Sequence, residues 1–373
     1  MNILIIVKTL SEKDGQGRYS LDFIGELAKR HKITVLSPDN YNLDLLGRLG
    51  VSVVAIPNLL NIRKGFGGAL KYFRVFWRHL KQNDLVHFFA DLPGYMIFSP
   101  LMLFSAKPYF VTAHGTYIPT SLDHGCYRYL VGRFLKKAKG VICVSNFTKN
   151  EILKRQSLAN IFVINNGVHF DKFYNSGKGQ ADKGEEKIIL TVGTLKKRKG
   201  FDIAIRAAGK IKKDIPNFKY YIVGDQSDKK YFGDLQKIVD ESGLSENVVF
   251  LSNISDEELI GLYARARVFI LTPVILNDNN FEGFGLVYLE ANAGGIPVIG
   301  TKGCGAEDAI KDGYNGILVE QNNVDQTAEA LNRILSDAHF AKQLGDNGVA
   351  WAKEFDWRNI YFKYQNIYDQ FVK

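Results

Sequence analysis

The sequence of 373 residues is poor in cysteine, methionine and tryptophan, with three of each. Cys126, Cys143 and Cys304 are widely spaced and form no Cys-x-x-Cys pair, which argues against a disulfide framework and indicates a reducing compartment. No stretch approaches the ~18 consecutive apolar residues of a membrane span, and the apolar start is too short for a signal peptide. These absences predict a cytoplasmic protein.

Acidic residues are scarce in the first half. Residues 1–170 hold 22 Lys and Arg against 10 Asp and Glu, a net charge of +12, whereas residues 171–373 hold 26 against 29, a net charge of −3. Such asymmetry favours two domains with different partners, the basic one meeting an anionic surface, either phospholipid or nucleic acid. No helix-turn-helix, zinc or RNP-type motif supports nucleic acid, so a nucleic-acid-binding protein is the weaker alternative.

Short apolar runs alternate with helical patterns, and this rhythm occurs twice. It predicts two tandem Rossmann-like, doubly wound α/β domains, with ligands outside the carboxyl ends of the strands and in the cleft between the domains. Strands are expected at Asn2–Val7, Ile33–Leu36, Ser52–Ile56, Leu85–Phe89, Tyr109–Ala113, Val141–Val144, Ile188–Val192, Tyr220–Val223, Val248–Leu251, Val268–Leu271, Pro297–Gly300 and Ile317–Val319.

The expected domains are residues 1–170 and 188–353. Residues 171–187 are rich in Gly, Lys and acidic residues with little pattern, which predicts a linker. Helical patterns close the chain, and residues 354–373 are expected to form a helix that packs back toward the first domain.

The segment KDGQGRYSLDF follows the first expected strand. Gly15 and Gly17 precede a helical pattern, so their backbone N–H groups are placed to meet a phosphate. As a dinucleotide fingerprint it is poor, because Ser20 replaces the third glycine and the turn begins eight residues after Val7. The dehydrogenase reading is therefore weak, and a flexible surface loop is an equal alternative.

The segment TVGTLKKRKGFD follows the first strand of the second half. Gly193 permits a turn, and the four cations Lys196–Lys199 then stand at the carboxyl end of that strand. Lysine and arginine there suit a diphosphate, although an isolated charge run is more often a solvated face.

The segment FEGFGLVYLEANAGG has glycines that open a helix between two glutamates. The N–H groups of Gly285, Leu286 and Val287 would form a seat for an anion. Glu290 stands in an apolar stretch and needs a partner, and a carboxylate accepts hydrogen bonds from a diol. The plain alternatives are that Glu282 offsets the helix dipole and that Glu290 is solvated. Phosphate and hydroxyl recognition together indicate a nucleotide sugar.

The stretch EGFGLVYLE, with seven residues between its glutamates, resembles the signature of the family-4 retaining glycosyltransferases of the GT-B fold. VSNFTKNEILKR, VINNGVHFDKF, VGTLKKRKGF and YIVGDQS follow the order of that family. The resemblance implies transfer of a hexose-type sugar from a UDP- or GDP-sugar to an acceptor hydroxyl, with retention of anomeric configuration. The donor is a co-substrate, and no cofactor is expected. A nucleotide-sugar epimerase on the same fold is the alternative.

The resemblance also implies residue roles, which fall into donor binding and catalysis. Glu290 would hold the ribose, and Glu282, with the backbone of Phe284 and Gly285, would hold the donor sugar. Leu286 and Val287 would bind the α-phosphate, and Arg198 and Lys199 would bind the diphosphate beside the turn of Gly193 and Thr194. Gly15 and Gly17 would approach from the other domain, and His114 would contact the sugar near the anomeric carbon. The family often has Gly-Arg-Leu at Gly193-Thr194-Leu195, so Arg198 would substitute for the missing cation. No Asp-x-Asp triplet occurs, so a metal chelating the diphosphate is not supported.

The acceptor side is suggested by residues 61–82, NIRKGFGGALKYFRVFWRHLKQ. A basic amphipathic helix with Trp and Phe suits a membrane interface, but an ordinary helix packing its aromatics on the sheet is as good a reading. With the net charge of +12, the segment favours a lipid-linked acceptor of cell-envelope or capsule polysaccharide synthesis, and peripheral contact with the inner face of an anionic membrane. Gly94–Ala106 is apolar but too short to span, which predicts a buried helix.

Overall fold

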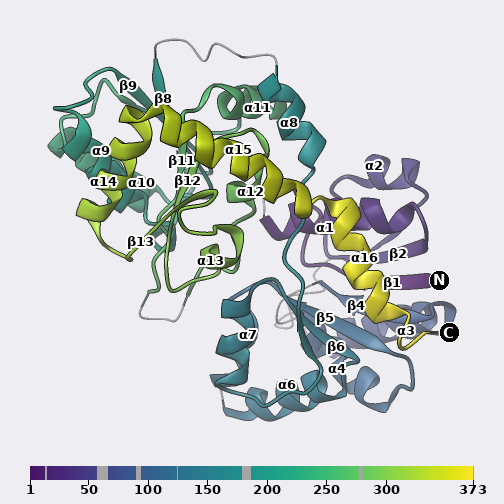
Figure 1. Ribbon diagram of the computed structural model, residues 1–373. Helices are drawn as coiled ribbons and strands as arrows, with labels where there is room; N and C mark the ends of the chain where they lie inside the picture. The colour runs from purple at the N-terminus through teal and green to yellow at the C-terminus, as the bar shows by residue number, and fades with distance from the viewer. Residues whose placement is uncertain are drawn as a thin grey trace. The chain divides into compact units, whose positions relative to one another are not determined.

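The computed structural model describes residues 1–12, 15–56, 66–89, 94–123, 125–178, 186–276 and 280–372. The chain forms two compact units: Met1–Gly167 together with Trp357–Lys373, and Val168–Asp356 (Figure 1). Each unit is a parallel sheet covered by helices, which confirms the predicted doubly wound α/β architecture. Within the described residues, no helix is both long and apolar enough to cross a membrane.

The first unit contains a seven-stranded sheet in which every pairing is parallel. Its strands are near-continuous apolar runs because helices cover both faces of the sheet. In spatial order they are β3 (Ser52–Ala55), β2 (Lys32–Ser37), β1 (Asn2–Ile6), β4 (Leu85–Phe88), β5 (Tyr109–Ala113), β6 (Gly140–Cys143) and β7 (Ile161–Val163).

Helices of the first unit divide between the two faces of this sheet. Phe76 and Phe98 share one core cluster with Val86, Phe88 and alternate residues of the neighbouring strands, so their helices cover that face. The helices of this unit are α1 (Gly15–Ala28), α2 (Leu43–Arg48), α3 (Phe66–Gln82), α4 (Gly94–Phe104), α5 (Tyr117–Asp123), α6 (Gly125–Lys137), α7 (Asn146–Leu153) and α16 (Trp357–Tyr368).

The last helix, α16, belongs to the first unit although it comes at the end of the chain. It lies against α1 (Figure 1), with the rings of Phe23 and Tyr364 4.3 Å apart. The hydroxyls of Tyr19 and Tyr364 are 2.8 Å apart, and the Tyr368 hydroxyl is 2.5 Å from Nδ1 of buried His87. The aromatic face of α16 therefore completes the core on this side of the sheet.

The second unit contains a six-stranded parallel sheet with the same doubly wound order. Its strands, in spatial order, are β10 (Val248–Leu251), β9 (Phe218–Val223), β8 (Lys187–Val192), β11 (Val268–Ile270), β12 (Val298–Thr301) and β13 (Gly316–Val319). Its helices are α8 (Phe170–Lys178), η2 (Lys197–Lys199), α9 (Phe201–Ile211), α10 (Lys229–Glu241), α11 (Asp256–Arg265), α12 (Leu286–Ala293), α13 (Ala306–Ala309), α14 (Val324–Ser336) and α15 (Ala338–Glu354).

Helix α8 corrects the predicted linker of residues 171–187. Residues 171–178 are helical and part of the second unit, because Phe170, Phe173 and Tyr174 recur at helical spacing and pack. The ring of Phe173 meets Tyr263 edge-on at 5.3 Å, and both Phe170 and Phe173 are buried. The rest of the predicted linker, residues 179–185, lies outside the described residues, and β8 begins at Lys187.

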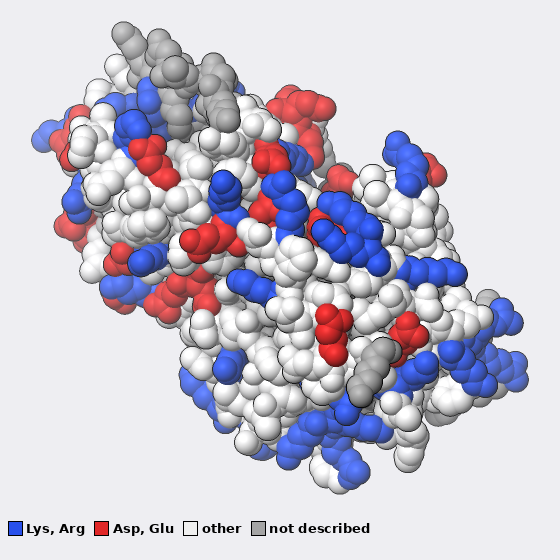
Figure 2. Space-filling model, turned by 45° about the vertical axis from the view of Figure 1, so that its right-hand side comes forward, with Lys and Arg blue, Asp and Glu red and all other residues white. Residues whose placement is uncertain are grey.

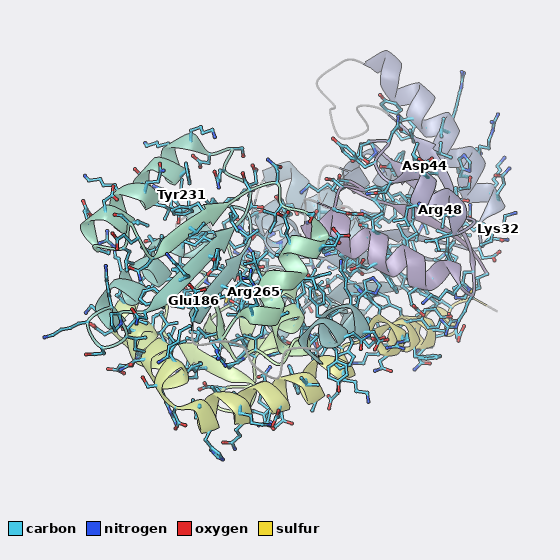
Figure 3. All side chains as sticks on the ribbon, turned by 90° about the horizontal axis from the view of Figure 1, so that it is seen from above. Lys32, Asp44, Arg48, Glu186, Tyr231 and Arg265 are labelled. Atoms are coloured by element: carbon cyan, nitrogen blue, oxygen red, sulfur yellow. The ribbon has the colours of Figure 1, made fainter. Side chains whose placement is uncertain are left out.

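Each predicted strand is found, with its ends shifted by at most two residues. The sequence did not predict β7, which has three residues, or the short helices α2 and α5. Polar residues mark the outside of each unit in Figure 3, as Lys32 at the start of β2 and Arg48 in the last turn of α2 show. The Asn-rich segment 277–279 and residues 61–65 lie outside the described residues.

Candidate active site

The strand order of the second sheet reverses between β8 and β11. β9 and β10 lie on one side of this point, β12 and β13 on the other. In doubly wound sheets, ligands bind outside the carboxyl ends of the strands where the order reverses, because the loops there diverge. The segments that follow β8 and β11 carry the two strongest sequence motifs of this half of the chain.

Three charged side chains from these segments form a cluster in which Glu282 is buried and the two cations are half-buried. Oε2 of Glu282 is 2.9 Å from Nη1 of Arg198 and 2.5 Å from Nζ of Lys199. Glu282 is 8% exposed, and the side chain of Lys199 is 13% exposed. The structure thus brings together three of the four predicted catalytic residues, and Glu282 partners both cations.

The charge states in this cluster depend on one another. Burial would raise the pKa of Glu282, but Lys199 and Arg198 outweigh this effect and lower the pKa to about 2. Burial lowers the pKa of Lys199, against the opposing effect of Glu282. Because Glu282 stays ionised at neutral pH, it is a fixed anion that orients two cations and not a proton donor.

Backbone contacts hold the cationic turn against the loop after β11. Gly200 has φ +66°, and a Cβ at this position would lie 1.8 Å from the carbonyl oxygen of Thr272. The hydroxyl of Thr272 donates to the Gly200 carbonyl at 2.7 Å, and the Val274 amide donates to the Arg198 carbonyl at 2.9 Å. Only glycine fits this close approach, which fixes where Arg198 and Lys199 stand.

Helix α12 begins beside the cluster without a side-chain cap. Its N-cap is Gly285, with φ +87°. Leu286 and Val287 are half-buried, while the helix from Tyr288 to Ala293 is buried, so the N-terminus is the part of the helix that reaches the surface. Amides of a first helical turn have no partner within the helix, and the helix dipole favours an anion there. This is the helix end at which the sequence predicts an anion seat, and the seat stays a prediction.

Glu290 lies one turn further along α12, with 4% of its surface exposed. Its Oε2 accepts a hydrogen bond from the hydroxyl of Tyr263, on α11, at 2.8 Å. The ring of Phe173, on α8, packs edge-on against the ring of Tyr263. The solvated-helix reading of Glu290 is therefore wrong, since a buried carboxylate is held by a tyrosine that the sequence analysis did not single out.

The structure separates the residues of the turn after β8. The Gly193 amide donates to the Val223 carbonyl at 2.8 Å, so this amide belongs to the sheet, and the role of the turn in donor binding stays a prediction. Lys196 and Lys197 are exposed, so the solvated-face reading holds for these two cations, whereas Arg198 and Lys199 turn inward. Thr194 is half-buried between the sheet and this turn.

Gly15 and Gly17 lie in the first turn of α1, directly after the loop that follows β1. They are therefore not in a flexible loop. A Cβ at Gly17 would lie 2.1 Å from the carbonyl oxygen of Ser11, whereas a Cβ at Gly15 would contact nothing within 4 Å. The packing against Ser11 explains Gly17 by itself, without a ligand.

His114 follows β5 at the carboxyl edge of the first sheet. Its ring meets Tyr19 of α1 edge-on, with the centroids 4.6 Å apart. Tyr19 also packs against Trp357 of α16. His114 is thus packed against Tyr19 of α1, which is in turn packed against α16, and Gly115 follows His114 with φ +142°.

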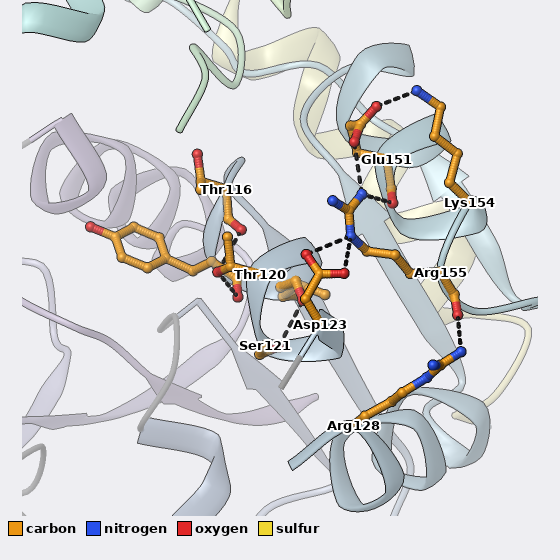
Figure 4. A network of polar contacts seen from close by, with 10 residues as sticks. Thr116, Thr120, Ser121, Asp123, Arg128, Glu151, Lys154 and Arg155 are labelled. Carbon is orange, nitrogen blue, oxygen red and sulfur yellow. Dashed lines mark hydrogen bonds and ion pairs between the residues drawn. The ribbon is translucent and has the colours of Figure 1, made fainter. Parts of the chain in front are cut away.

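The segment after His114 is fixed by a polar network (Figure 4). The hydroxyl of Thr120, in α5, donates to the carbonyl of Thr116, the residue just before this helix. Nε of Arg155 is 2.8 Å from Oδ1 of Asp123, and Nη1 of Arg155 is 2.7 Å from Oε2 of Glu151. Because Asp123 ends α5 and Glu151 belongs to α7, Arg155 joins the helices that follow β5 and β6.

Comparison with known proteins identifies the family of the chain. The family model "Glycosyltransferase Family 4" matches residues 13–172, and "Glycosyl transferases group 1" matches residues 175–351. The chain therefore belongs to the group 1 glycosyltransferases of family 4. A GDP-mannose-dependent alpha-(1-6)-phosphatidylinositol monomannoside mannosyltransferase of Mycolicibacterium smegmatis is 28% identical over 360 residues, which are 93% of this chain and 92% of the relative.

Solved structures show that this glycosyltransferase has the GT-B fold. A glycosyltransferase from Rickettsia africae matches with a TM-score of 0.82 at 22% identity, over 99% of this chain and 98% of its own. Anabaena Alr3699/HepE, crystallised with UDP and glucose, matches with a TM-score of 0.82 at 19% identity, over 99% and 100% of the two chains.

Two further features of the glycosyltransferase site had no local signal in the sequence. Tyr263 and Glu290 are 27 positions apart, and the Gly305 amide donates to the Glu282 carbonyl at 2.9 Å. A Cβ at Gly305 would lie 2.0 Å from the Gly283 carbonyl oxygen, so close packing explains why the last residue of TKGCG is glycine. Among the residues that the structure describes, no group of three or more His, Cys, Asp or Glu side chains is arranged to hold a metal ion.

Proposed function

We propose that this glycosyltransferase transfers a hexose from a nucleoside diphosphate sugar to a hydroxyl of a lipid-linked glycan acceptor, with retention of anomeric configuration. The observation that carries the proposal is the cluster of Arg198, Lys199 and buried Glu282 beside the uncapped start of α12. Two half-buried cations and a helix N-terminus together suit a diphosphate.

Donor binding would use the second unit. The amides of Leu286 and Val287 would meet the α-phosphate, and the Glu290 carboxylate, held by Tyr263, would accept hydrogen bonds from the ribose hydroxyls. Glu282 would keep Arg198 and Lys199 in place before the donor arrives, and would face the sugar afterwards. The relative from M. smegmatis uses GDP-mannose and HepE binds UDP-glucose, so both bases are candidates.

The cations would assist departure of the nucleotide. The bond from the anomeric carbon to the phosphate oxygen breaks, and negative charge develops on the diphosphate, where Arg198, Lys199 and the helix N-terminus stabilise it. The acceptor hydroxyl attacks from the same side, and its proton passes to a phosphate oxygen of the leaving nucleotide. His114, from the first unit, would contact the donor sugar. We propose that these groups act without a bound metal.

A donor and acceptor screen tests this proposal. The protein is incubated with UDP- and GDP-hexoses and a membrane lipid extract, and sugar recovered in the lipid fraction is measured, with NMR of the product to assign the anomer. We expect one donor to label lipid with retention, in the presence of a chelator. Conversion of the donor to another sugar without any acceptor would instead support the epimerase, and labelling of no lipid by any donor contradicts the proposed acceptor.

A further inference from the structure

Helices α3, α4 and α6 of the first unit contain no Asp or Glu. Figure 2 shows blue side chains gathered along the lower and right-hand parts of the view, where Figure 1 places these helices. The exposed cations described on them are Arg74, Arg78 and Lys81 of α3, and Arg128, Arg133, Lys136 and Lys137 of α6.

Large aromatic side chains are exposed on the same three helices. Phe104, at the end of α4, is 92% exposed, Tyr129 of α6 is 68% exposed and Trp77 of α3 is 42% exposed. An exposed phenylalanine has no polar group to interact with water, so such exposure in water is unfavourable. Each aromatic thus stands on a helix with, or next to, the exposed cations.

The three helices form one continuous layer. Phe76 of α3 and Phe98 of α4 stack with centroids 4.1 Å apart, and α4 packs against α6. These helices bury one side in the same core cluster. Their opposite sides therefore share one surface, which we call the α3–α4–α6 surface.

Lysines hold the exposed end of α4 in place. Nζ of Lys137 donates to the carbonyls of Leu103 and Ser105, on either side of Phe104. Nζ of Lys107 donates to the Asn83 carbonyl at 2.7 Å, just after the end of α3. The segment that presents Phe104 to solvent is thus bonded to the helices on both sides.

We propose that the α3–α4–α6 surface docks on an anionic phospholipid bilayer. Phe104 would enter the boundary between headgroups and acyl chains, and Trp77 and Tyr129 would lie at the headgroup level. The cations around them would meet the phosphates of acidic lipids. This assigns the membrane contact to three helices, whereas the sequence suggested residues 61–82 alone.

Two other occupants fit this surface less well. Nucleic acid would engage the cations but would leave the Phe104 ring without an apolar environment. A second copy of the chain would bring two surfaces of like charge together, which is unfavourable. Of these three occupants, the bilayer is the one that provides both phosphates for the cations and an apolar region for the aromatic rings.

Co-sedimentation of the full chain with vesicles tests the surface, with no donor or acceptor present. We expect binding to vesicles of phosphatidylcholine mixed with phosphatidylglycerol, weak binding to phosphatidylcholine alone, and loss of binding as salt rises. Phe104→Ser, and separately the triple variant Arg74→Glu, Arg78→Glu, Lys136→Glu, should each weaken binding roughly tenfold or more.

Matched controls separate the surface from general charge and general apolarity. Phe362→Ser removes an aromatic that is 53% exposed on α16, and Lys213→Glu, Lys229→Glu, Lys230→Glu changes the net charge equally in the second unit. Both should bind vesicles as the unmodified protein does, and circular dichroism checks the folding of every variant. The proposal is overturned if test and control variants lose vesicle binding equally, or if the unmodified protein binds no vesicles. It is also overturned if the protein binds duplex DNA more tightly than anionic vesicles at the same salt concentration. Self-association that the Phe104→Ser variant loses while vesicle binding persists also overturns it. None of these outcomes depends on whether sugar transfer is observed.

Discussion

The two units have the same doubly wound architecture but carry different chemistry. In the second unit, the point where the strand order reverses holds a cluster of half-buried Arg198 and Lys199 with buried Glu282, beside a helix N-terminus. In the first unit, α1 and His114 stand at the corresponding carboxyl edge, held by the aromatic rings of Tyr19 and Trp357. The sheets supply an equivalent edge, and the loops after the strands decide which chemistry stands there.

The largest expected effect is on turnover, and it should be confined to the inward-facing cations of the second unit. Lys199→Gln removes a charge that we place at the diphosphate, so turnover should fall by about 10²-fold with a smaller change in donor affinity. Lys197→Gln is the matched control, since Lys197 is exposed in the same turn. Steady-state kinetics would refute this role for Lys199 if both variants lost activity equally.

Glycine substitutions should destabilise each unit separately. Gly200→Ala and Gly17→Ala each place a Cβ about 2 Å from a carbonyl oxygen, which requires the backbone to move. We expect each substitution to lower the free energy of unfolding by about 2–3 kcal/mol, measured by calorimetry. Gly200→Ala should destabilise the second unit, and Gly17→Ala should destabilise the first.

The matched control for these substitutions is Gly261→Ala, within α11. A Cβ there meets nothing within 4 Å, so the change should stabilise the helix by about 0.5–1 kcal/mol. If Gly200→Ala and Gly261→Ala had the same melting temperature, the close approach of Gly200 to Thr272 would not require glycine.

Acid should remove a stabilising contribution specific to the second unit. Since the folded pKa of Glu282 lies below its ordinary value of 4.5, its contribution is complete above pH 4.5 and is lost as pH falls toward about 2. The difference in stability between the unmodified protein and Glu282→Gln should therefore shrink over this range in denaturant titrations. Glu320→Gln, which removes a surface ion pair, is the control. If the difference in stability between the unmodified protein and Glu282→Gln did not change with pH, Lys199 and Arg198 would not lower the pKa of Glu282.

The smallest expected effect lies in the first unit. Tyr364→Phe removes the 2.8 Å contact with the Tyr19 hydroxyl and should cost about 1 kcal/mol of unfolding free energy. Donor affinity should not change, because the donor site is assigned to the second unit. Tyr361→Phe is the comparison on the same helix, because Tyr361 is also buried but its hydroxyl contacts His31 and Gln365. A loss of nucleotide affinity in Tyr364→Phe would contradict the assignment of donor binding to the second unit.

Local patterns predicted every described strand except the three-residue β7, because buried parallel strands are continuous apolar runs. They failed where structure depends on distant residues. The Gly- and Lys-rich composition after Phe170 indicated a linker, whereas packing of Phe173 on Tyr263 makes α8 a helix. The same holds in the site: Glu282 and Arg198 are 84 positions apart, and only the fold shows that they pair.

The glutamate motif was sufficient to recognise the family, but it did not reveal how each glutamate is held. Tyr263 on Glu290, and the Gly305 amide on the Glu282 carbonyl, come from segments with no distinctive pattern. The roles of Glu290 toward the ribose and of His114 toward the sugar stay predictions.

Titration of UDP and GDP against the unmodified protein and Glu290→Ala tests the central claim, that the second unit holds the donor nucleotide through Glu290. Calorimetry should show one nucleotide binding to the unmodified protein and a dissociation constant at least about tenfold higher for Glu290→Ala, because hydrogen bonds to a charged group are lost at ~1.5–3 kcal/mol each. Tyr263→Phe, which retains the carboxylate, should show a smaller change. Equal affinity in the unmodified protein and Glu290→Ala, or no binding of either nucleotide, would contradict the account.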